Sequence, residues 1–171
     1  MYEVAKVLSS QPECDTCRLC EEKVGLVYIF NAEKRNFRVE DVLSIKTGVH
    51  YLKRTEENQC VFFDNEKGRC KIYSKRPLAC RIYPLDLMKL DGELWWVAYP
   101  ECPIMKRYQN QRNLFPLIKL VSELESATDA KTLKEWENLD RYHTDIEAMG
   151  WEHYNTVRLK KHGIKDVIFP L

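Results

Sequence analysis

Seven cysteines are the residues of this chain whose type and spacing could do chemistry. Three stand early in a C-x2-C-x2-C pattern, three follow with nine residues between neighbours, and the last precedes a proline. In order they are Cys14, Cys17, Cys20, Cys60, Cys70, Cys80 and Cys102. Closely spaced thiols can bind a metal, form disulfides or act as a redox dithiol. Disulfide frameworks favour even counts, short chains and a signal peptide, and this sequence shows none of these. We therefore interpret the cysteines as metal ligands.

The kind of metal follows from the spacing of the thiols. Thiolate-rich sites select zinc or iron–sulfur clusters. A structural zinc usually takes two separated C-x2-C pairs, and no second such pair follows the first cluster here. C-x2-C-x2-C also opens the bacterial ferredoxin pattern, whose later cysteine precedes a proline, as Cys102 precedes Pro103. The sequence therefore predicts an iron–sulfur cluster, 4Fe–4S, with zinc as the alternative.

Seven thiols cannot complete two sites of four cysteines each. One site can be complete, and the other then needs a carboxylate, a histidine, a water or a substrate. Glu21 and Glu22 directly follow Cys20 and could supply an oxygen, and His50 is the nearest imidazole. For each of these three side chains we favour a surface position over ligation, because most glutamates and lone histidines are not ligands.

The chain between Cys60 and Cys80 must bring three thiols to one place. Turn residues within 64–68 predict a hairpin that brings Cys60 and Cys70 together. Pro77 then redirects the chain, because proline fixes its own φ and biases the preceding residue away from helix. We expect Cys80 to return to the same point.

The elements around this segment are short. Residues 24–30 form an apolar run that suits a buried strand or an extended loop lining the centre. Residues 39–46 predict a short helix that Gly48 ends. Asp91-Gly92 between alternating apolar runs predicts a hairpin with strands at about 85–90 and 93–99. The adjacent Trp95 and Trp96 then point to opposite faces, and one of them can pack in the core.

Helical periodicity replaces cysteine after residue 103. One apolar stripe comprises Leu114, Leu117, Ile118, Val121 and Leu124. Thr128-Asp129 is a good N-cap for a second helix that Gly150 ends, and a third is predicted over 151–161 with Gly163 as its stop. The predicted fold class is α+β: a small cysteine-ligated metal-binding core, 1–104, with short strands and a β-hairpin, then a helical segment, 105–171. We expect the two parts to pack as one globular unit.

Charge and hydropathy bear on partners and location. The 27 basic and 26 acidic residues nearly cancel, which argues against nucleic acid as the partner and leaves an unidentified protein partner open. The sequence has no apolar run near the length that spans a bilayer, so we expect no membrane and a cytoplasmic location. A small basic cluster could contact RNA or an acidic partner, although basic residues at a helix end explain it better. Its members are Arg158, Lys160, Lys161, His162 and Lys165.

The cysteines and their neighbours resemble a known family, the zinc- or iron-chelating cysteine-cluster proteins of the YkgJ type, whose relatives include flagellin lysine N-methylase. The resemblance lies in the N-terminal cluster, in C-x9-C-x-I-Y from Cys60, in R-P-x2-C-R-x-Y-P from Arg76, and in the late Cys-Pro. It implies a metal or iron–sulfur centre held by the seven cysteines, but no agreed reaction. The family pattern closes its first cluster with two adjacent cysteines. Here Glu21 stands in the second place, so Glu21 is a ligand or that site is open.

Four further residues accompany the thiols, namely Tyr73, Arg76, Arg81 and Tyr83. Arg81 could lower the pKa of a thiolate or bind an anionic substrate. We favour a supporting role, in which these side chains donate hydrogen bonds to cluster sulfurs or backbone carbonyls and fix the loop.

Three functions follow from this sequence. The first is an iron–sulfur protein in electron transfer or in a protein-modification system. The second is a zinc protein whose metals are structural and whose surface binds a partner. The third, a protein lysine N-methylase, rests on one branch of the family and lacks a glycine-rich nucleotide loop, so whether the chain is an enzyme stays open.

Overall fold

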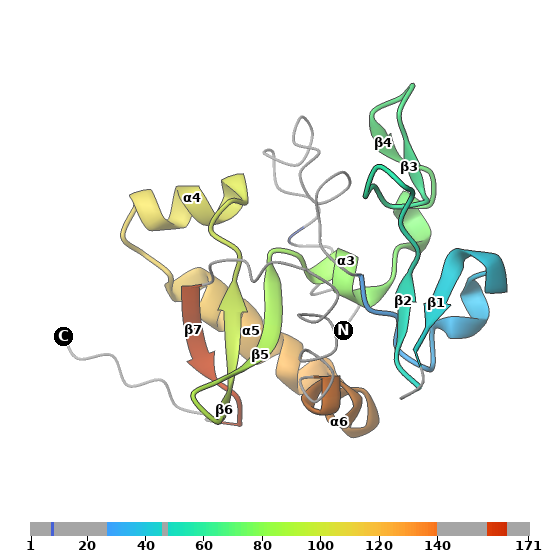
Figure 1. The fold of residues 1–171 in the computed structure, drawn as a ribbon. Coiled ribbons are helices and arrows are strands. Elements are labelled where there is room, and N and C mark those ends of the chain that lie inside the picture. The colour runs from blue at the N-terminus through green and yellow to red at the C-terminus, as the bar shows by residue number, and fades with distance from the viewer. Residues whose placement is uncertain (1–7, 9–26, 46–47, 140–156, 164–171) are drawn as a thin grey trace. The chain divides into compact units, whose positions relative to one another are not determined.

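The computed structural model describes residues 8, 27–45, 48–139 and 157–163 (Figure 1). Within these residues the chain combines short antiparallel strands with helices, so the predicted α+β class is confirmed. The chain divides into two compact units, which we call the thiol unit (Leu8–Tyr83) and the sheet unit (Met1–Val7 with Pro84–Leu171). The units part between Tyr83 and Pro84, and the sequence-based division at residues 104–105 stays a prediction.

The core of the thiol unit forms where an extended segment lies against a small sheet. Strands β1 (Val42–Ser44) and β2 (His50–Leu52) pair antiparallel. The described part of the predicted apolar run, residues 27–30, is extended and fully buried. Its Ile29 N–H donates to the His50 carbonyl at 2.9 Å, and its Val27 carbonyl accepts from Leu52 N–H at 2.9 Å. This run is therefore extended backbone beside β2. Extended backbone is what both predictions for the run, a buried strand or an extended loop, have in common.

The helix predicted over 39–46 is wrong. Two short 3-10 turns, η2 (Lys34–Asn36) and η3 (Val39–Asp41), precede β1, which occupies the middle of the predicted helix. Val42 is buried and Leu43 is exposed, which is the alternation of a strand. A helix this short has little stability of its own, so pairing with β2 prevails. Gly48 has φ +83° and lies in the hairpin turn between the two strands.

The second hairpin of the thiol unit follows the prediction. Strand β3 (Phe63–Asp64) pairs antiparallel with β4 (Arg69–Cys70). The Asp64 carboxylate accepts the N–H of Glu66 at 3.1 Å and of Lys67 at 3.2 Å, which holds the turn. The 3-10 turn η4 (Tyr73–Lys75) follows, and helix α3 (Leu78–Ile82) begins directly after Pro77.

The sheet unit is built on the predicted Asp-Gly hairpin. Strands β5 (Leu85–Leu90) and β6 (Glu93–Ala98) pair antiparallel, and the turn residues Asp91 and Gly92 have φ +54° and +81°. Two successive positive φ values give the turn whose twist matches that of the strands. Trp96 is fully buried, whereas Trp95 is half-buried with the Arg158 guanidinium 5.5 Å from its ring centroid. The two tryptophans therefore serve opposite faces, as predicted.

The third helix predicted over 151–161 is wrong in its described part, which is strand β7 (Val157–Lys161). It pairs antiparallel with β6, with a register shift at Trp96/Val97, and completes a three-stranded sheet. Leu159 and Lys160 are buried. Pairing with the open edge of β6 overrides local preference here, because strand propensity depends on partners that are far away in sequence. Gly163, with φ +79°, follows the strand rather than a helix.

The basic cluster of the tail is therefore not a helix end, and its described members face carboxylates. Arg158 pairs with Asp91 at 2.5 Å, Lys161 pairs with Glu93, and Lys160 pairs with Glu125. These pairs hold β7 to the hairpin and to helix α5. Lys165 lies outside the described residues.

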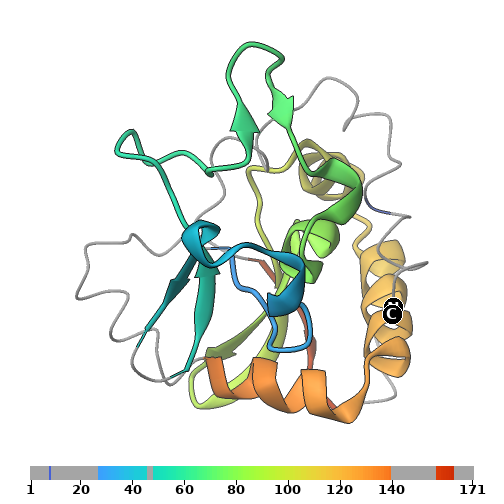
Figure 2. The same cartoon turned by 90° about the vertical axis from the view of Figure 1, so that its right-hand side faces the viewer.

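Three helices accompany the sheet, namely α4 (Pro103–Asn110), α5 (Phe115–Ala127) and α6 (Ala130–Leu139). The predicted stripe of α5 is confirmed at Leu117, Ile118, Val121 and Leu124, which are buried, whereas Leu114 is half-buried at the N-cap. Leu120, which was not predicted, is buried as well. Asp129 accepts Thr132 N–H at 2.9 Å and starts α6, which runs across the end of α5 (Figure 2). Residues 140–150 of the predicted helix lie outside the described part. No helix in the described ranges is long and apolar enough to cross a membrane.

Candidate metal centre

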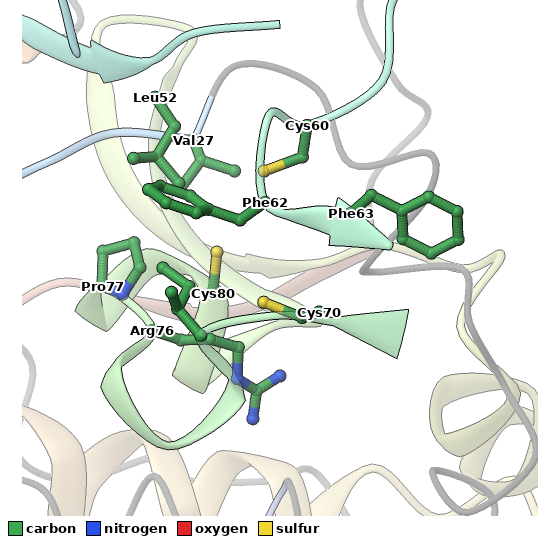
Figure 3. A pocket seen from close by; sticks show the side chains of 10 residues that line it. Val27, Leu52, Cys60, Phe62, Phe63, Cys70, Arg76, Pro77 and Cys80 are labelled. Carbon is green, nitrogen blue, oxygen red and sulfur yellow. The ribbon is translucent and has the colours of Figure 1, made fainter. Parts of the chain in front are cut away.

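Three of the seven cysteines line one pocket of the thiol unit. The side chains of Cys60, Cys70 and Cys80 all border it, and their sulfur atoms face the same space (Figure 3). Together with Cys102 they are present as thiols and not as halves of disulfides. The central segment therefore brings these three thiols to one pocket, while their ligation of a metal stays a prediction. The four cysteines of the described residues are not in disulfides.

Each of these thiols comes from a different local element. Cys60 forms an isolated bridge with Arg54 just before β3. Cys70 ends β4, where the register places it opposite Phe63. Cys80 lies in the middle of α3, one short turn after the chain has been redirected by Pro77. The hairpin alone can bring only Cys60 and Cys70 together. The turn at Pro77 is needed in addition to bring Cys80 to the same pocket.

The walls of the pocket are mostly apolar. They are formed by Val27, Leu52, Phe62, Phe63, Ile72 and Pro77. Burial raises the pKa of the Cys60 thiol, and the Phe62 N–H and the positive charge of Arg54 oppose this only in part. A thiol in this setting stays protonated without a cation, and a bound metal ion would supply the charge that stabilises thiolate.

Arg76 is the charged side chain on the pocket wall. It is 6% exposed, and its Nε donates to the Tyr73 carbonyl at 3.1 Å. Its guanidinium carbon also lies 3.7 Å from the centroid of the Tyr73 ring. Arg81 donates to the Arg76 carbonyl and lies 3.9 Å from the Glu33 carboxylate. These contacts fix the loop between Cys70 and Cys80, while a role toward a bound metal stays a prediction. Tyr83, half-buried, follows the last residue of α3.

Glu33 is the residue near this site that sequence reasoning missed. It is 8% exposed, and its Oε1 accepts the Leu78 N–H at 2.9 Å. That N–H lies at the start of α3, where the first amides of a helix have no partner within it. Glu33 therefore anchors the helix that carries Cys80. The contact joins residues that are 45 positions apart, so no local sequence pattern predicts it.

The remaining predicted ligands fall elsewhere. Cys14, Cys17, Cys20, Glu21 and Glu22 lie outside the described residues. Cys102 belongs to the sheet unit, where it is 5% exposed and stands at the N-cap of α4, with Pro103 beginning the helix. His50 is a buried residue of β2 whose Nδ1 lies 2.8 Å from the Ser44 hydroxyl, and it is not among the residues that line the pocket. The surface position expected for His50 is therefore wrong.

The three pocket thiols form a partial ligand set. In the parts of the chain that the structure describes, no three His, Cys, Asp or Glu side chains are grouped so that they could hold a metal ion. The donor type nevertheless fits, since three thiols that face one pocket are the ligands that zinc and iron–sulfur clusters take. Metal sites are commonly completed only when the metal binds, because ligation is coupled to folding.

Comparisons with known proteins give one family and one curated relative to report. Residues 13–114 match the family described as "CxxCxxCC: Putative zinc- or iron-chelating domain". The uncharacterized protein MJ0661 of Methanocaldococcus jannaschii is 36% identical over 47 residues, covering 24% of this chain and 26% of that protein. The chain thus spans about a quarter of that relative's length. No solved structure matches the chain. The match extends over all seven cysteines and supports zinc or iron chelation as their chemistry.

Proposed function

Because this chain belongs to the CxxCxxCC family of zinc- or iron-chelating domains, as its resemblance predicted, we propose that its cysteines hold an iron–sulfur cluster. The cluster would act in electron transfer or serve a protein-modification system. The expected ligands are thiolates of the pocket cysteines and of the N-terminal cluster, with Cys102 as a further thiol. The reducing conditions that keep such thiols available are those of the cytoplasm.

The observation that carries this proposal is the convergence of three sulfurs on one apolar pocket. Cys60, Cys70 and Cys80 are separated by nine residues each, yet all three line the same space. An apolar wall also limits access of water, which is one of the levers that set the reduction potential of a cluster.

The residues of this chain would have distinct tasks at such a centre. An iron–sulfur cluster supplies reversible one-electron chemistry when bound. The pocket thiols would bind it as thiolates, and the apolar side chains would exclude water. Arg76, one of the residues that line the pocket, would add a positive charge in the neighbourhood of an anionic centre, although its guanidinium points away from the three sulfur atoms (Figure 3).

Zinc is the second candidate, either as a structural metal in a protein whose surface binds a partner or, with only three thiols in the pocket, as a metal with an open position. Three protein ligands with a fourth position filled by water or substrate are typical of reactive zinc. Protein lysine methylation is a third function, drawn from one branch of the resemblance alone. It is tested by mass spectrometry of candidate proteins after incubation with S-adenosylmethionine.

Anaerobic purification followed by elemental analysis and visible spectroscopy separates the first two functions. An iron–sulfur protein is brown, contains iron with acid-labile sulfide, and loses its visible absorption on oxidation in air. A zinc protein is colourless and contains zinc without sulfide. Protein that carries neither metal after purification and after anaerobic reconstitution would overturn the proposal in both forms.

A further inference from the structure

Basic residues are concentrated in the segment that runs from the second half of the β3–β4 hairpin to the end of α3, whereas the first half of the hairpin carries Asp64 and Glu66. Residues 67–83 include six basic residues and no acidic one, although the whole chain is nearly neutral. Four of these cations are exposed, together with one aromatic ring. We call this set the basic face, and its members are Lys67, Arg69, Lys71, Tyr73 and Lys75.

Alternation along the chain sets this face apart from the thiol pocket. Cys70 and Ile72 line the pocket, whereas Arg69, Lys71 and Tyr73 are exposed. Arg69 and Cys70 are neighbours in β4, where successive side chains point to opposite sides, and the following turn continues the alternation with Lys71 exposed and Ile72 on the pocket. Whatever fixes the position of Cys70 therefore also fixes the basic face.

The cations of this face are available for a partner. Within the described residues, the side chains of Lys67, Arg69, Lys71 and Lys75 form no ion pair, in contrast to the paired cations of β7. Two acids, Asp64 and Glu66, stand at the hairpin turn, and the carboxylate of Asp64 is engaged with backbone N–H groups there. Such a group of unpaired like charges is a local positive field, even in a neutral chain.

Tyr73 adds a stacking surface among these cations. It is 42% exposed, and the Arg76 guanidinium lies 3.7 Å from its ring centroid. A ring held in this way loses little further freedom when a second planar group stacks on it. Cations that track a phosphate backbone beside an exposed aromatic ring are the pattern of single-strand nucleic-acid binding.

We propose that the basic face binds single-stranded nucleic acid, with Lys67, Arg69, Lys71 and Lys75 on phosphates and a base stacked on Tyr73. An acidic protein is the competing partner, but protein interfaces usually mix both signs of charge, whereas a phosphate backbone needs only one. The expectation from net charge, which argued against nucleic acid, averages over the chain and misses this local field. The inference does not depend on which metal the thiols hold.

Fluorescence anisotropy with a labelled oligo(U) RNA and the full-length, metal-loaded chain tests this proposal. Lys71→Glu with Lys75→Glu should weaken binding at low salt by roughly tenfold or more and reduce the salt slope by roughly 1 to 1.5. Lys34→Glu with Arg35→Glu is the matched control, because these exposed cations of η2 lie outside the face and give the same change in net charge. Tyr73→Ala should weaken binding about 5- to 150-fold, which corresponds to the loss of one stacked base.

Several outcomes would overturn the proposal. These are an absence of RNA binding at low salt, equal effects of the face and control variants, or unchanged affinity in Tyr73→Ala. Polyglutamate that competes as well as unlabelled oligo(U) would assign the face to an acidic protein instead. Circular dichroism and metal content verify that each variant folds. If the variant with Lys71→Glu and Lys75→Glu does not fold, the variant with Lys67→Ser and Lys75→Ser replaces it. This variant should also weaken RNA binding.

Discussion

Phe63 and Cys70 stand directly opposite each other across the β3–β4 hairpin. Both line the thiol pocket, so this one register pair determines that the second thiol faces the same space as Cys60 and Cys80. A slip of one residue would turn Cys70 to the solvent and Lys71 to the pocket, because side chains alternate along a strand. The hairpin turn is thus part of the candidate metal centre.

Loss of a pocket thiol should remove metal from the chain. Cys70→Ser and Cys80→Ser should each lower the bound metal per chain by about half or more, because a serine hydroxyl does not replace thiolate toward soft metals. Elemental analysis after anaerobic desalting measures this. Ser74→Ala, an exposed neighbour, is the control and should keep its metal. Full metal content in both cysteine variants would show that these thiols are not ligands.

Removal of the Glu33 carboxylate should loosen the helix that carries Cys80. Glu33→Ala should cost about 1–3 kcal/mol in free energy of unfolding, because the buried Leu78 N–H loses its acceptor. Glu33→Gln keeps an acceptor oxygen and should cost less. Urea denaturation followed by circular dichroism gives both values, with the exposed Glu66→Ala as control. Equal stability of the alanine variant and the unmodified chain would remove Glu33 from this role.

Glu125 should be the carboxylate on which attachment of β7 depends. It pairs with the buried Lys160 and accepts the indole N–H of Trp96 at 2.8 Å. Glu125→Ala should cost about 3–5 kcal/mol, since it leaves the ammonium of Lys160 buried and unpaired. Glu123→Ala, exposed on the same helix, should stay within about 0.5 kcal/mol. Similar losses in the two variants, measured by chemical denaturation, would contradict this account of the sheet unit.

The same glutamate predicts a pH dependence of stability. Burial raises the pKa of Glu125, but hydrogen bonds from Lys160, Trp96, His162 and the Gly163 N–H together outweigh burial and leave the pKa below its ordinary value. His162 adds to the lowering, with its Nδ1 2.6 Å from the carboxylate. A carboxyl with a lowered pKa stabilises the fold above its unfolded-state pKa, and this stability is lost as the pH falls through the folded-state pKa.

Denaturation midpoints at neutral pH and below about pH 4 test this sign. The unmodified chain should lose more stability on acidification than Glu125→Gln does, because the amide does not titrate. Parallel losses in the two proteins would assign the acid sensitivity to other carboxyls.

Local chemistry explains which elements could be predicted. The β5–β6 hairpin follows from Asp91-Gly92, because two residues with positive φ are enough to fix the register of both strands. The apolar stripe of α5 follows from helical periodicity in the same way. Strand β7 could not be found like this, since its partners, such as Asp91 for Arg158, lie 67 residues away.

The residues of the candidate site also fall into those that local sequence predicts and those that it does not. Cys60, Cys70 and Cys80 could be placed together from the hairpin turn and the proline between them. Glu33, which anchors α3, has no signal in its neighbouring sequence. Residues 39–46 were misassigned because the apolar spacing of so short a segment suits a helix and a strand alike, and only the pairing of Val42 with Leu52 decides between them.

X-ray absorption spectroscopy at the metal edge of the anaerobically purified chain tests the central claim most directly, because it identifies the atoms bound to the metal. Ligation by the cysteine thiolates predicts sulfur neighbours, at about 2.3 Å for zinc, and for an iron–sulfur cluster an additional shell of iron. Cys80→Ser should lower the sulfur count or abolish the signal. A first shell made only of nitrogen and oxygen atoms would contradict the account.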